Sequence, residues 1–170
     1  LSKTIYGFIR LITERYKMKK TKIGSVGVDS GQLMISDPCY VNDFVANDFE
    51  DIRRYKNKKS GKVLEYKKDF SHYEEIIPEY KKTMNELNSN GEWIELPHPH
   101  LEDRSYSYKG SCMATLKSHG GELGNSLGVV FSSGFGDGCY DVYAYTKDIE
   151  GWGNRVCKVE IVLIDPEDRN

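Results

Sequence analysis

Apolar and polar residues alternate along the last third of the chain, and this alternation predicts a β-rich body. The clearest strands are residues 139–146 and 155–164, and further extended runs occupy 106–116 and 127–131. Side chains on a strand point alternately to two faces, so such runs are typical of half-buried antiparallel sheets. In the last strand one face carries Cys157, Val159, Ile161 and Leu163.

Earlier in the chain the pattern predicts two more strands and two helices. Residues 22–29 and 32–37 read as strands joined by a tight turn at Ser30-Gly31. Apolar residues then recur at steps of three and four over 41–55 and again over 73–87, which predicts amphipathic helices. The fold class expected is therefore α+β, a predominantly antiparallel β-sheet or sandwich with about two helices.

The expected organisation is a single β-rich domain over residues 23–164, with a helical insert at about 42–90. Residues 1–22 differ, because basic side chains surround apolar residues at helical spacing. This basic N-terminal extension could form an amphipathic helix, or it could be a segment dispensable for the site. Residues 165–170 are expected to form a tail.

Charge and cysteine content narrow the class of protein. The formal net charge of -2 makes nucleic acid an unlikely main partner, and no apolar run approaches the length of a membrane span.

The four cysteines form no CxxC pair, so common zinc spacings are absent. We expect reduced, mostly buried thiols in a cytoplasmic protein.

The best candidate site is the glycine-rich stretch over residues 132–140. Glycine occupies positions 134, 136 and 138, which indicates backbone torsions or a close approach that a side chain would forbid. Asp137 stands between two of these glycines, so its carboxylate is expected on a sharply bent, exposed segment. The ligand-binding residues predicted for this site are Asp29, Asp37, Tyr40, Ser133, Gly134, Gly136, Asp137, Gly138 and Tyr140.

Several segments in this order resemble a known family. They are Val28-Asp29-Ser30-Gly31-Gln32-Leu33, Asp37-Pro38-Cys39-Tyr40, Tyr108-Lys109-Gly110-Ser111-Cys112, residues 131–143 and Val159-Glu160-Ile161. The set resembles bacterial and phage proteins of the domain of unknown function family numbered 4241, over about residues 23–164. The resemblance implies a small, soluble, β-rich protein and carries no established activity.

The first functional hypothesis is a non-catalytic binding protein. The backbone N–H groups of the turn at 134–138 would face a small polar or phosphorylated ligand, as backbone nests do. Tyr40, Tyr140 or Tyr143 could stack on a base or sugar, and a protein partner is the other occupant considered. No pattern identifies a cofactor.

Three alternatives remain open. A metal-dependent hydrolase would use Asp29, Asp37 and Asp137 around a hard cation, with His119 as base. A cysteine nucleophile would be Cys139 or Cys112, activated by His119. In the last alternative the protein is purely structural, and the glycine turn only connects two strands.

Overall fold

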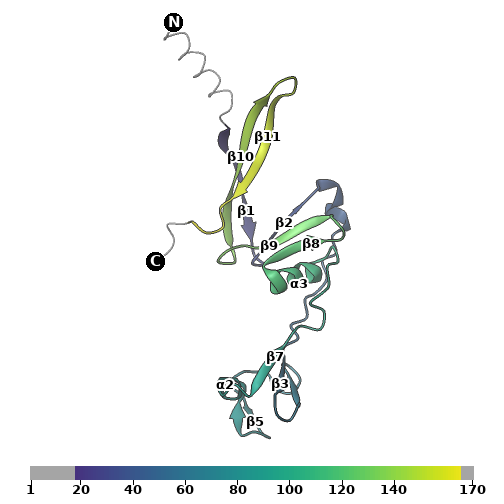
Figure 1. The fold of residues 1–170 in the computed structure, drawn as a ribbon, viewed down its shortest axis with the longest axis vertical. Helices are drawn as coiled ribbons and strands as arrows, with labels where there is room; N and C mark the ends of the chain where they lie inside the picture. Colours follow the sequence, from purple (N-terminus) through teal and green to yellow (C-terminus); the bar gives the residue numbers. More distant parts are fainter. Residues whose placement is uncertain (1–17, 166–170) are drawn as a thin grey trace. The chain divides into compact units, whose positions relative to one another are not determined.

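The computed structural model describes residues 18–165, and these form mainly antiparallel strands with few helices (Figure 1). The expected α+β class is confirmed. The elements are β1 (Lys19–Val28), β2 (Gln32–Ser36), η1 (Pro38–Asp43), β3 (Arg54–Asn57), β4 (Val63–Glu65), β5 (Ile76–Ile77), β6 (Lys82–Thr83), α2 (Met84–Ser89), β7 (Trp93–Leu96), α3 (Tyr108–Ser118), β8 (Gly120–Leu123), β9 (Gly128–Ser132), β10 (Gly138–Ile149) and β11 (Gly153–Ile161). The predictions for residues 1–17 and for most of the tail lie outside the described residues. No helix in the described part of the chain is long and apolar enough to span a membrane.

The chain divides into two compact units. Among the described residues, unit 1 consists of 18–33 with 132–165, and unit 2 is Met34–Phe131. Unit 1 is therefore built from two separate stretches of the chain, whereas unit 2 is one continuous stretch.

The sheet of unit 1 has the order β1-β10-β11, with both outer strands antiparallel to β10. The expected strands over 139–146 and 155–164 are confirmed as β10 and β11. Lys20 pairs with Tyr145 and Lys22 with Tyr143, so these side chains share one face of the sheet. The register shifts between Lys22 and Gly24, which leaves Ile23 in a bulge.

Unit 2 contains two buried apolar clusters. The first joins the β4-β3-β7 sheet to α2 and the β5-β6 pair; it consists of Tyr55, Leu64, Phe70, Ile77, Met84, Leu87 and Trp93. The second lies where α3 packs on β8 and β9, and it consists of Tyr106, Ala114, Leu123 and Val130. Figure 1 shows α3 lying against the β2-β9-β8 sheet.

The prediction of a helix over 41–55 is wrong, because Val45 in this stretch forms backbone hydrogen bonds with the distant residues Tyr106 and Tyr108. Val45 N donates to Tyr106 O and Tyr108 N donates to Val45 O, at 3.1 and 2.9 Å. These bonds satisfy the backbone in an extended conformation, and only a 3₁₀ turn, η1, precedes it. The predicted helix over 73–87 begins only at Met84, where Thr83 and Glu86 form a capping box.

The strand expected over 106–116 is also wrong, because this stretch contains α3. Ser107 caps the helix by accepting from Gly110 N at 3.0 Å, and the following residues 110–114 are buried. The strands expected at 22–29 and 32–37 exist, but they do not form a hairpin. Strand β1 pairs with β10, whereas β2 belongs to the β2-β9-β8 sheet.

All four cysteines are free thiols, but the expectation that most are buried is wrong. Only Cys112, on the packed face of α3, is buried. Cys39, Cys139 and Cys157 are exposed. The last two lie on strands of the unit 1 sheet, most of whose side chains remain accessible.

Candidate functional site

The glycine-rich turn connects β9 to β10 and is fixed by hydrogen bonds within unit 1. Ser133 is fully buried; its N–H donates to Gly31 O at 3.0 Å and its Oγ donates to Gly136 O at 2.7 Å. The Tyr140 hydroxyl lies 2.5 Å from Ser133 O and 2.8 Å from Gly136 O, so it closes the turn from the strand that follows. The turn is thus a built structure rather than a loose connection.

Two of the three glycines have positive φ angles. Gly134 has φ +67°, and a Cβ there would lie 2.6 Å from Leu163 O. Gly136 has φ +107° with open space around it. At Gly138 a Cβ would meet only the Tyr140 ring at 3.6 Å, which is an ordinary contact.

Asp137 links this turn to the connection between β1 and β2. Its Oδ1 accepts from Gly31 N at 2.9 Å, and Oδ2 has no hydrogen-bond partner among residues 18–165. Asp29, two residues before Gly31, is exposed. One carboxylate oxygen therefore stabilises the turn, and the other remains available to a ligand.

The two remaining predicted residues belong to unit 2. Asp37 caps η1 by accepting from Cys39 N at 2.8 Å, and Tyr40 lies within η1 with 39% of its surface exposed. No group of three or more His, Cys, Asp or Glu side chains in the described part of the chain could hold a metal ion. His119, the expected base, ends α3 in unit 2 with φ 61°.

A cavity of about 580 Å³ opens beside the turn, and three of the predicted residues line it: Asp137, Gly138 and Tyr140. The other lining residues are Lys20, Phe135, Cys139, Asp141, Tyr143, Val162, Leu163 and Asp165. Phe135 has 76% of its surface exposed and presents an uncovered ring.

The charges around this cavity are mainly negative, with three carboxylates against the single ammonium of Lys20. Lys20 Nζ is paired with Glu160 at 2.7 Å and lies 4.3 Å from the centre of the Tyr143 ring. Asp141 accepts from Lys22 and Ser25, and these bonds lower its pKa, so it stays ionised.

Sequence reasoning missed Lys20, Phe135 and Asp141 as parts of this site. Lys20 lines the cavity because β1 pairs with β10. The expected pairing of β1 with β2 in a hairpin would not have placed Lys20 there. Phe135 lies between Gly134 and Gly136, so its position in the glycine-rich turn could have marked it as a residue of the site. A second cavity, in unit 2, was also missed, because residues 49–55 were expected to be helical.

Comparison with known proteins gives one match. A family model described as a protein of unknown function, DUF4241, matches residues 12–159. No curated protein and no solved structure matches the chain. The matched range includes the glycine turn, β1 and β10, which contribute most of the cavity lining, but it ends before Val162, Leu163 and Asp165.

Proposed function

We propose that this chain, which belongs to the DUF4241 family, is a non-catalytic binding protein whose glycine-turn cavity holds a small, uncharged polar ligand. One observation carries the proposal: the unpartnered oxygen of Asp137 and the exposed ring of Phe135 line the same cavity. A carboxylate beside an uncovered ring suits a ligand that combines hydroxyl groups with a flat or apolar face.

The hydroxyl groups would donate to Asp137. A hydrogen bond to an ionised carboxylate is roughly twice as strong as one between neutral groups. Because Oδ1 is already held by Gly31 N, the carboxylate has a fixed direction, and binding requires little ordering of the side chain. The Phe135 ring would stack on a base or on the apolar face of a sugar.

The same charges disfavour a phosphorylated ligand. A phosphate would meet three carboxylates, and Lys20, the single cation lining the cavity, is engaged by Glu160. The Gly136 N–H, which a backbone nest would offer to an anion, donates to Ser133 O at 3.2 Å. An uncharged ligand therefore suits the cavity better than an anion.

Adenosine is a suitable probe, because it combines a stacking base with a ribose diol. In isothermal titration with the full chain, we expect adenosine to bind, and AMP and 2′-deoxyadenosine to bind more weakly. The variant Asp137→Asn keeps an oxygen for Gly31 N but loses the charge. It should raise the adenosine Kd about tenfold, because a charged hydrogen bond is worth about 1.5–3 kcal/mol and a neutral one about 0.5–1.5 kcal/mol, and a difference of about 1.4 kcal/mol is tenfold in Kd.

Asp148→Asn is the matched control, because it removes the same charge from an exposed position of β10 outside the cavity. It should leave the adenosine Kd unchanged. Tighter binding of AMP than of adenosine would contradict the proposal. So would an Asp137→Asn variant with unchanged affinity, or a chain that binds none of the three compounds.

A further inference from the structure

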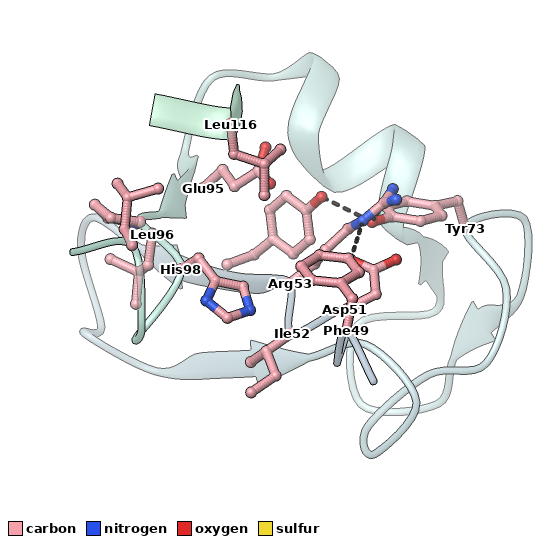
Figure 2. Close-up of a pocket in the computed structure, with 12 residues that line it drawn as sticks. Phe49, Asp51, Ile52, Arg53, Tyr73, Glu95, Leu96, His98 and Leu116 are labelled. Atoms are coloured by element: carbon pink, nitrogen blue, oxygen red, sulfur yellow. Dashed lines mark hydrogen bonds and ion pairs between the residues drawn. The ribbon is translucent and has the colours of Figure 1, made fainter. Parts of the chain in front are cut away.

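A larger cavity, of about 830 Å³, lies in unit 2 where residues 49–54 run beside residues 95–98 (Figure 2). The two segments are joined by hydrogen bonds: Arg54 Nη2 donates to Pro97 O at 3.0 Å, and His98 Nε2 bonds Glu50 O at 3.0 Å. A cavity of this size falls in the range that holds small molecules.

Four aromatic residues contribute to the walls of this cavity; Tyr55 is largely buried, and the Tyr73 ring has the Arg53 guanidinium 5.9 Å from its centre. Phe49 and His98 stack with centroids 5.9 Å apart, and Tyr55 and Tyr73 meet edge to face at 6.1 Å. The two tyrosine hydroxyls bond each other at 2.9 Å, so their polar ends are already satisfied. Burial and this bond raise the pKa of Tyr55, which keeps it a neutral phenol.

His98 adds a neutral ring rather than a cation. Its Nδ1 accepts from His100 N at 3.1 Å, which requires an unprotonated nitrogen. The proton therefore sits on Nε2, which donates to Glu50 O. Both nitrogens are engaged, so the ring contributes its aromatic surface.

Glu95 carries the excess charge of the cavity. Arg53 Nε bonds Asp51 Oδ1 at 2.9 Å, so these two lining charges balance each other. The Glu95 carboxylate has no hydrogen-bond or ion-pair partner among residues 18–165. Figure 2 shows Glu95 and His98 on one side of the site, and Asp51, Arg53 and Tyr73 on the other.

We propose that this cavity binds a small organic ammonium ion, a function separate from that of the glycine-turn cavity. Electron-rich rings attract a cation over their faces, and proteins use this attraction to recognise quaternary ammonium groups such as that of choline. Glu95 supplies the opposite charge. The side chains of Ile52 and Leu96 contact the apolar part of the ligand.

The test compares two probes of the same shape, choline and its uncharged isostere 3,3-dimethylbutan-1-ol. In isothermal titration with the full chain, choline should bind at least tenfold more tightly than the alcohol. Glu95→Gln should raise the choline Kd about tenfold and leave the weak affinity for the alcohol unchanged. Phe49→Leu should weaken choline binding about threefold to fivefold.

Glu150→Gln provides the control, because it removes the same charge from an exposed turn of unit 1. Its choline affinity should match that of the natural chain, as should that of Asp137→Asn. Glu95 is exposed on β7, and a far-UV circular dichroism spectrum checks that Glu95→Gln is folded. Equal affinity for the two probes, no choline binding, or full affinity in folded Glu95→Gln would each overturn the proposal.

Discussion

At Gly134 two separate constraints exclude a side chain. The φ angle of +67° is costly for any residue with a Cβ, and that Cβ would lie 2.6 Å from Leu163 O. Gly151 has a similar φ of +76° but open space around it. Gly134→Ala should therefore lower the free energy of unfolding by about 2–4 kcal/mol, and Gly151→Ala by only about 1 kcal/mol. Urea denaturation measures both, and equal losses would show that Leu163 moves aside at little cost.

Single residues also show what the sequence could reveal about the turn. The glycines were identifiable, because positive φ angles leave a local signature in residue type. The partners of the turn were not, since Gly31 lies 106 positions before Asp137 and meets it only through the fold. The hydrogen bond from the β1–β2 connection to Asp137 therefore has no counterpart in any local sequence pattern.

Among the elements, the three strands of the unit 1 sheet are linked by one carboxylate in addition to their backbone pairing. Glu160 on β11 accepts from Lys20 of β1 at 2.7 Å and from Tyr145 of β10 at 2.9 Å, and it also pairs with Lys158. Lys158, then Lys20 and Tyr145, lower the pKa of Glu160 to about 2. This carboxylate bridges all three strands.

The pH dependence of stability follows from this lowered pKa. A carboxyl group whose pKa is lowered by folding stabilises the fold at pH values above its ordinary pKa of 4.5. This contribution to stability is lost as the pH falls to the lowered pKa of about 2. Glu160→Gln should therefore lose less stability between pH 5 and pH 2 than the natural chain, as measured by urea midpoints. Glu150→Gln, outside the network, should retain the full loss. An identical pH profile in Glu160→Gln would show that the bridge adds nothing to stability.

The elements also differ in how far their sequence determines them. Strands β10 and β11 were predictable, because they are adjacent in the chain and carry their own alternation. The stretch 41–55 carries helical spacing but is not an α-helix, because Val45 bonds Tyr106 and Tyr108 and residues 54–55 pair with β4 and β7. The residues of α3 show an apparent alternation of polar and apolar side chains that is typical of a strand. Ser107 nevertheless caps the N-terminus of a helix, and α3 begins directly after it.

On the scale of the whole molecule, apolar burial is unevenly distributed. Both buried clusters lie in unit 2, whereas the buried apolar residues of unit 1 are Val28 and Ala144 among those described. Val156 and Val159 on β11 are 60% and 53% exposed. This division could not be predicted from the sequence, because apolar residues are frequent in both units and only tertiary contacts decide which are covered.

Local stability should follow this distribution of buried surface. Regions with few buried apolar contacts open at lower free energy, and their amides exchange faster. In hydrogen exchange followed by mass spectrometry, peptides from β10 should exchange at least about tenfold faster than peptides from α3. Peptides from β3, which carries Tyr55 of the first cluster, should behave like those of α3. Equal protection of β10 and α3 would mean that the two units open together, and that the exposed sheet is stabilised as strongly as the buried clusters.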